Sequence, residues 1–111
     1  MVHQMKLWKG PFDAIRSGRK RVELRLNDPK RQKIQPGDQI VFTQTESGEQ
    51  IRAEVLEKLV FPDFQQLYQE ISAEEMGYAP GETPDFRDME RFYSREQIQA
   101  FGTAAIRIRL L

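Results

Sequence analysis

The chain has 111 residues, with 17 basic and 17 acidic side chains that give a formal net charge of zero, and it contains no cysteine. Its length predicts one domain over residues 1–111, and the missing thiols exclude disulfides and thiolate metal sites and fit a reducing cytoplasm. With a single histidine and no apolar run near the roughly 18 residues that span a bilayer, we expect no metal, no cofactor and no membrane partner.

The first two elements are predicted to be a strand and a short helix. Residues 4–9 alternate apolar and polar side chains, which is the period-two pattern of a strand. A proline at the first helical position and Gly18 at the stop predict a helix over residues 11–17. Trp8 falls on the polar side of the strand, where it is either a structural residue at an edge or a platform on which a base stacks.

A charged strand comes next. Residues 21–27 alternate apolar side chains with charged or amide ones, which predicts a strand with one face in the core. The other face is a row of cation, anion, cation and amide formed by Arg21, Glu23, Arg25 and Asn27. An Asp-Pro pair and three bases occupy residues 28–33, where we expect a basic loop.

The rest of the chain is predicted to hold three strands and several short helices. The expected strands cover residues 39–45, 50–60 and 103–110, and the expected helices cover residues 62–71, 86–93 and 94–101. Ser47-Gly48 marks a hairpin between the first two of these strands, and the second is long enough to bend or carry a bulge.

These elements predict an α+β fold that is mainly β. We expect a small β-barrel with flanking helices and a helical insert before the last strand. Pairing of the first and last strands is expected, because closure would remove both exposed sheet edges.

The charges are distributed unevenly along the chain. Residues 1–33 carry ten basic and three acidic side chains, whereas residues 34–111 carry seven basic and fourteen acidic ones. One interpretation is a basic face directed at an anionic ligand. The other is that the charges of the two parts pair with one another across the fold.

An ordered set of residues along nearly the whole chain has a familiar spacing. It includes Pro11-Phe12, Gly18, Lys20, Glu23-Leu24-Arg25-Leu26, Asp28, Lys30-Arg31, Gly37-Asp38, Tyr93-Ser94, Gln97-Ile98 and Phe101-Gly102. In this set the chain resembles the ASCH domain, a family that belongs with the PUA-like barrels. The resemblance implies a β-barrel flanked by helices, and binding of RNA or nucleotides through a cleft lined by residues 18–31.

One bacterial branch of this fold hydrolyses N4-acetylcytidine with a lysine, a threonine three residues later and a glutamate from the helical insert. Lys20 matches that lysine, and Glu23 stands where the threonine nucleophile would be. Glu74 or Glu75 could occupy the position of the acid. Without the hydroxyl, a carboxylate would have to activate water instead, which is a different chemistry.

The predicted function is binding of RNA or a nucleotide in a basic cleft formed by residues 18–33. The candidate binding residues are Trp8, Lys20, Arg21, Glu23, Arg25, Asn27, Lys30 and Arg31, whose cations suit phosphate and whose amide and aromatic groups suit bases. Tyr78 or Tyr93 could also stack a base.

Three alternatives to that prediction stay open. The chain could be a small hydrolase acting on an N4-acylcytidine-like amide or on RNA, with Lys20, Glu23 and Glu75 as the candidate catalytic residues. Glu23 could instead form a plain ion pair with its arginine neighbours. The aromatic residues Tyr78, Phe86, Phe92 and Tyr93 could form a protein-interaction surface or, in the simpler interpretation, a satellite core. The sequence does not indicate which protein such a surface would bind.

Overall fold

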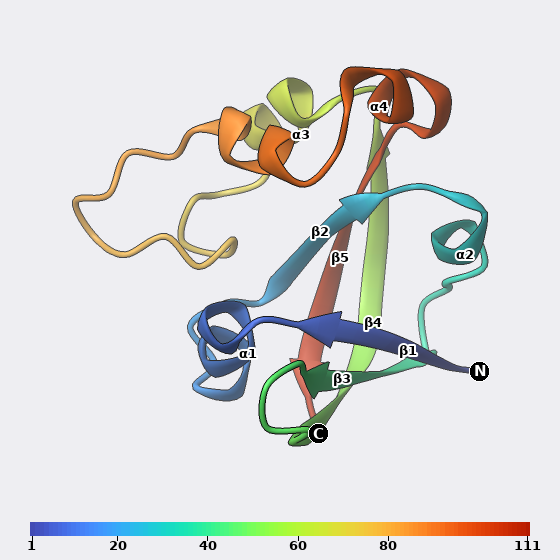
Figure 1. Cartoon of the computed structure of the whole chain (residues 1–111), viewed down its shortest axis with the longest axis vertical. Coiled ribbons are helices and arrows are strands. Elements are labelled where there is room, and N and C mark those ends of the chain that lie inside the picture. The colour runs from blue at the N-terminus through green and yellow to red at the C-terminus, as the bar shows by residue number, and fades with distance from the viewer.

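The computed structural model describes all of residues 1–111. Five strands form one curled sheet (Figure 1). The strands are β1 (Val2–Leu7), β2 (Val22–Leu26), β3 (Gln39–Gln44), β4 (Gln50–Phe61) and β5 (Thr103–Leu110). Their order in the sheet is β1-β3-β4-β5-β2. Only β1 and β3 pair in parallel, and the other pairs are antiparallel. The predicted α+β, mainly β class is confirmed.

Short helices flank the sheet. They are α1 (Lys9–Arg16), α2 (Pro29–Gln32), α3 (Phe64–Glu70), the 3₁₀ helix η1 (Phe86–Arg91) and α4 (Arg95–Phe101). Three of them follow β4 and precede β5, which confirms the predicted helical insert. The capping box at the start of α4 is also confirmed, since Ser94 and Gln97 exchange hydrogen bonds there. No helix combines the length and apolar character that crossing a membrane requires.

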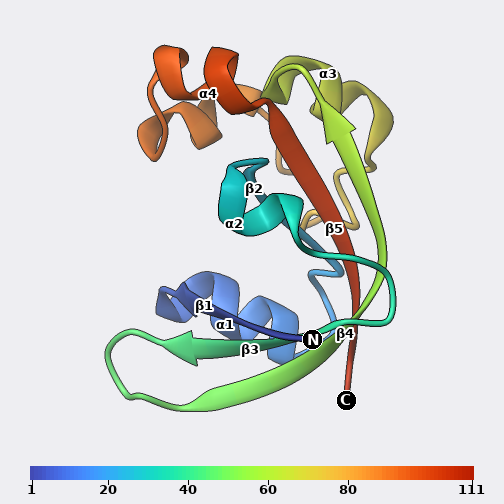
Figure 2. The ribbon, with the colours of Figure 1, turned by 90° about the vertical axis from the view of Figure 1, so that its right-hand side faces the viewer.

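The sheet does not close through its first and last strands, so that expectation is wrong. Both edges of β5 are occupied, one by β4 and the other by β2, and β1 pairs with β3 alone. The sheet curls instead, with β4 bending from its pairing with β3 round to its pairing with β5 (Figure 2). The curl brings its two free edges, β1 and β2, close together. The guanidinium of Arg25 on β2 donates to the carbonyl of Lys6 on β1 at 3.0 Å and bridges this seam.

The basic segment after β2 is a helix rather than the expected loop. The Asp28 side chain accepts a hydrogen bond from the Arg31 backbone N–H at 3.1 Å, and Pro29 occupies the first helical position. Both features favour a helix start, because the cap satisfies a free N–H and proline has no N–H to lose. At the other end of α2, the ammonium of Lys58 donates to the carbonyls of Arg31 and Gln32.

The predicted irregularity in β4 is confirmed. The register between β4 and β5 shifts between Val55 and Glu57, as it does at a β-bulge. A bulge bends a strand, so β4 can pair with β3 at one end and with β5 along the rest of its length.

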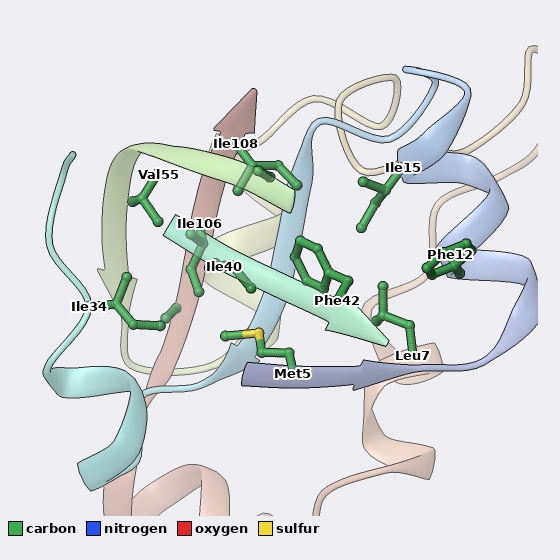
Figure 3. Close-up of a cluster of buried hydrophobic side chains, with 12 residues drawn as sticks. Met5, Leu7, Phe12, Ile15, Ile34, Ile40, Phe42, Val55, Ile106 and Ile108 are labelled. Carbon is green, nitrogen blue, oxygen red and sulfur yellow. The ribbon is translucent and has the colours of Figure 1, made fainter. Parts of the chain in front are cut away.

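Two hydrophobic cores lie on opposite faces of the sheet. The first, drawn in Figure 3, is enclosed by the curl and contains Met5, Leu7, Phe12, Ile15, Ile34, Ile40, Phe42, Ala53, Val55, Ala104, Ile106 and Ile108. The second packs under the helical insert and contains Val22, Leu24, Leu26, Phe64, Leu67, Ile71, Met76, Ile98 and Ala105.

Both faces of β2 are covered as a result. Its three apolar residues enter the second core, as the alternation predicts. Its other face is not open to solvent, since Glu23 lies opposite Ile106 and Arg25 lies opposite Ala104, both in the first core. The charged side chains of β2 therefore point into the concave side of the curled sheet.

Replacing Gly102 by alanine tests the close approach of β4 and β5 at the top of the sheet. The new Cβ would lie 2.9 Å from the Phe61 carbonyl oxygen, at a φ of +71°. Gly48→Ala is the matched control, with a φ of +75° and open space around the Cβ. We expect Gly48→Ala to lower the free energy of unfolding by about 1 kcal/mol, and Gly102→Ala by about 1–3 kcal/mol more, in urea titrations. Equal losses of unfolding free energy in the two variants would mean that the Phe61 carbonyl moves away from the new Cβ at no energetic cost.

Candidate ligand-binding pocket

A pocket of about 330 Å³ opens at the seam between β1 and β2. Three segments line it: the end of β1 with the start of α1, residues 20–25, and residues 89–93 of the insert. Its charged and aromatic walls are Lys6, Trp8, Lys20, Glu23, Arg25, Phe92 and Tyr93. The volume lies at the lower end of the range for small-molecule sites, which is about 300–1,000 Å³.

The floor of the pocket carries a buried ion triad. The Glu23 carboxylate, whose side chain is 3% exposed, accepts from the Lys20 ammonium at 3.0 Å and from the Arg25 guanidinium at 3.1 Å. Burial by itself would raise the pKa of Glu23, but the charges of Lys20 and Arg25 outweigh it and hold that pKa below the ordinary value. Glu23 is therefore an anion that serves two cations.

Backbone groups fix the two cations of the triad. Arg25 divides its guanidinium between Glu23 and the Lys6 carbonyl, so its position depends on both sheet edges. Lys20 packs its aliphatic stem against Gly77, where an added Cβ would lie 3.1 Å from the Lys20 Cβ. Groups held in this way need little rearrangement when a ligand arrives.

The upper walls are aromatic. Trp8 and Phe92 meet edge to face with ring centroids 5.3 Å apart, and they are 63% and 51% exposed. Tyr93 is stacked on Phe64 at 5.9 Å with an interplanar angle of 16°. Burial raises the pKa of Tyr93, so its hydroxyl stays protonated at neutral pH.

A family model of the ASCH domain matches residues 5–111. The chain belongs to the ASCH domain family. No curated protein matches it. The crystal structure of hypothetical protein PH0355 has a TM-score of 0.84 and 29% identity, with all of both chains covered. The solution structure of PF0455 from Pyrococcus furiosus has a TM-score of 0.72 and 29% identity over all of this chain and 98% of that one.

More distant relatives share the fold. ASCH from Zymomonas mobilis has a TM-score of 0.68 and 20% identity, covering 97% of this chain and 66% of that one. The ASCH domain from Lactobacillus crispatus has a TM-score of 0.66 and 17% identity over 98% of this chain and 79% of that one. These two structures confirm the fold expected for an ASCH domain.

Only part of the predicted site comes together in this ASCH domain. Of the eight candidate binding residues, four line the pocket: Trp8, Lys20, Glu23 and Arg25. Tyr93, one of the two further stacking candidates, lines it as well. The sequence predicted that residues 18–33 form one cleft. They do not, because Lys30 and Arg31 lie on α2 beyond the end of β2. Asn27 also lies outside the pocket, and its Oδ1 is buried without a hydrogen-bond partner.

Arg21 is separated from the pocket although it shares the alternation of Glu23 and Arg25. It precedes the first residue of β2, and its backbone N–H donates to the Glu75 carbonyl at 2.8 Å. Its side chain lies in a different groove, where it comes within 3.6 Å of Glu74.

The expected acid of the hydrolase hypothesis does not join Lys20 and Glu23. The Glu75 carboxylate lies 2.9 Å from the Arg107 guanidinium and accepts from the Ser72 hydroxyl. The hydrogen bond from Arg107 is the main reason that the pKa of Glu75 is lowered. Glu74 is largely exposed. Glu75 lines the groove of Arg21, because its backbone carbonyl accepts from the N–H groups of Arg21 and Val22 at the start of β2.

The cations of residues 1–33 have different partners in different places. Two of them pair with acids of residues 34–111, Arg16 with Glu49 and Arg21 with Glu74. Lys9 and Arg31 pair instead with acids of their own part of the chain, Asp13 and Asp28. Lys20 and Arg25 share a single carboxylate, so the triad keeps a positive charge. Lys6 adds another on the same wall.

Sequence reasoning missed Met89 and Phe92 and did not count Lys6 among the binding residues. The alternation of residues 4–9, which puts Lys6 and Trp8 on the same side, was an available signal. The contact between Trp8 and Phe92 joins distant parts of the chain and leaves no local pattern.

The aromatic residues of the insert divide into two groups. Tyr78, Phe86 and Tyr93 pack against the second core, which confirms the satellite-core interpretation for them. Tyr78 donates to the Asp88 carboxylate at 2.9 Å, outside the pocket. Phe92 is instead exposed at the pocket mouth.

Glu23→Gln tests whether the triad is ionised and stabilising. Because the folded-state pKa of Glu23 is lowered, its contribution is complete above the ordinary value of 4.5 and is lost as pH falls through the folded-state pKa. We expect the variant to lose about 3 kcal/mol at pH 7, and the difference from the parent to shrink below pH 4.5. Urea unfolding from pH 7 to pH 3 measures this. A constant difference across that range would contradict the ionised triad.

Proposed function

We propose that this ASCH domain binds RNA or a nucleotide by taking one unpaired nucleotide into the pocket at the β1–β2 seam. The observation that carries the proposal is the pair of cations held over one buried carboxylate between aromatic walls. Family membership supports the same class of ligand.

The charge of the site favours a phosphate-bearing ligand. Lys6, Lys20 and Arg25 supply three cations against the single carboxylate of Glu23. A guanidinium presents a planar fork that fits phosphate oxygens, and an ammonium acts as a point charge beside it. Arg21, Lys30 and Arg31 lie outside the pocket. Arg21 and Arg31 pair with acids there, so of the three only Lys30 adds an uncompensated charge that attracts a polyanion.

The walls favour a base. Phe92 and Tyr93 offer ring faces, and stacking on aromatic rings tolerates every base. The pocket volume of about 330 Å³ suits one nucleotide rather than a duplex. Glu23 has only acceptor atoms, so it favours bases that present an amino group, such as cytosine or guanine.

Removing the Lys20–Glu23 ion pair as a unit tests this proposal. In Lys20→Met/Glu23→Gln both charges disappear together, which avoids the instability of a lone buried carboxylate. We expect affinity for a fluorescent single-stranded RNA to fall at least about tenfold, the effect of losing a charge-assisted hydrogen bond. The parent should show a salt slope of about −0.7 for each phosphate that it neutralises.

Arg52→Ala is the matched control, because Arg52 is an exposed cation on β4 that does not line the pocket. Affinity should stay within about twofold of the parent. Equal loss in the control and the double variant would place binding outside the pocket. Absence of binding at low salt would remove the proposal.

A hydrolase is the second candidate, because Lys20 and Glu23 are in contact inside the pocket. An ionised carboxylate can accept a proton from water, and the neighbouring ammonium can stabilise developing negative charge. The separate placement of Glu75 removes the third group of that mechanism. We therefore rank hydrolysis below binding.

Incubation with N4-acetylcytidine separates the two candidates. We expect no release of cytidine above the uncatalysed rate, measured by chromatography, because no general acid accompanies Lys20 and Glu23. Turnover that Lys20→Ala and Glu23→Gln both abolish, with Arg52→Ala active, would establish a hydrolase instead.

A further inference from the structure

A large aromatic side chain stands uncovered at the mouth of the pocket. Trp8 is 63% exposed even though its edge-to-face partner Phe92 covers part of it. Tryptophan offers one of the largest apolar surfaces of any side chain, so leaving it in water forgoes much stabilisation. Exposed apolar side chains that lie together at the rim of a site, as Trp8 and Phe92 do, mark a surface that a ligand can cover.

The backbone position of Trp8 is fixed by the elements on either side of it. Trp8 follows the last residue of β1 and is the N-cap of α1, and its carbonyl accepts from the Phe12 N–H at 3.0 Å. A strand on one side and a helix on the other leave the residue little backbone freedom. Stacking on such a ring costs little conformational entropy.

A free cation lies beside this ring. Lys6 precedes Trp8 by two residues and the backbone at Trp8 is still extended, so the two side chains leave the same side of the chain about 7 Å apart. Lys6 lines the pocket and forms no ion pair with an acid, whereas Lys9 on the other side of Trp8 pairs with Asp13 at 2.7 Å. The unneutralised charge therefore lines the same pocket as the exposed ring.

We propose that the site takes two consecutive nucleotides of single-stranded RNA. One base enters the pocket, the next stacks on Trp8, and the phosphate that links them lies at Lys6. A free mononucleotide would leave the ring and the ammonium without partners, so the ligand class is an oligonucleotide. The inference rests on the proposed function, to which it adds a second subsite.

Ligands that differ by one base test the second subsite. Cytidylyl-cytidine carries one linking phosphate and two bases, whereas the 3′- and 5′-methylphosphates of cytidine carry the same single charge and one base. Isothermal titration calorimetry gives the ratio of the dinucleotide affinity to the better methylphosphate affinity. We expect a ratio of roughly 5 to 150, the contribution of stacking one base on an aromatic ring.

Substitutions of Trp8 test whether this residue causes the higher affinity for the dinucleotide. In Trp8→Ala the ratio should fall to near one, and in Trp8→Phe most of it should return, because a smaller ring still stacks. Phe101→Ala is the matched control, since Phe101 is a partly exposed aromatic on α4 that does not line the pocket. Its ratio should equal that of the parent.

Lys6→Ala tests the position of the linking phosphate. Affinity for all three ligands should fall by a similar factor, and the salt slope should move from about −0.7 toward zero. An unchanged slope would overturn the placement of the phosphate at Lys6.

The remaining outcomes separate this inference from the proposed function. Measurable binding of the methylphosphates with a ratio near one in the parent would overturn the second subsite and leave the pocket standing. A high ratio that survives in Trp8→Ala would overturn the assignment to Trp8. No binding of any of the ligands would remove the proposed function, and this inference with it.

Discussion

The Glu23 carboxylate, buried between the Lys20 ammonium and the Arg25 guanidinium, is the contact on which the site depends. A lone buried carboxylate would be unstable or would take up a proton, so its two cations keep it charged. Arg25 also donates to the Lys6 carbonyl, and the triad therefore spans from β2 to β1. One set of charged hydrogen bonds thus stabilises the ion and fixes the distance between the two free sheet edges.

The pocket exists because the sheet is curled but open. If β5 paired with β1, the seam would be filled by a strand ladder, and Glu23 would face a sealed interior. With β2 beyond β5, the edges of β1 and β2 leave a gap that α1 borders on one side and residues 89–93 border on the other. The helical insert thus forms a wall of the site, and Gly77 leaves room there for the stem of Lys20.

Sequence patterns were reliable where neighbours along the chain decide the outcome. The apolar face of β2 and the capping box at Ser94 were predicted, because each depends on residues a few positions apart. The irregularity in β4 was predicted from the length of the strand. Patterns failed where a distant segment intervened. Arg21 follows the same alternation as Glu23, but the Glu75 carbonyl holds its backbone just before β2 begins. Residues 28–33 appeared to be a loop because their cap and proline also suit a turn.

By itself, the sequence determined most of the local elements, the fold class, the family and the presence of a charged strand over residues 21–27. Only the tertiary structure decided which charges meet. Period-two alternation gives a strand two faces but does not say what covers each, and here both faces of β2 are covered. The strand order and the curl of the sheet brought Lys6 and Phe92 to the seam and took Glu75 to Arg107. Contacts between residues tens of positions apart leave no periodic trace in the chain, so the composition of the pocket could be found only from the folded structure.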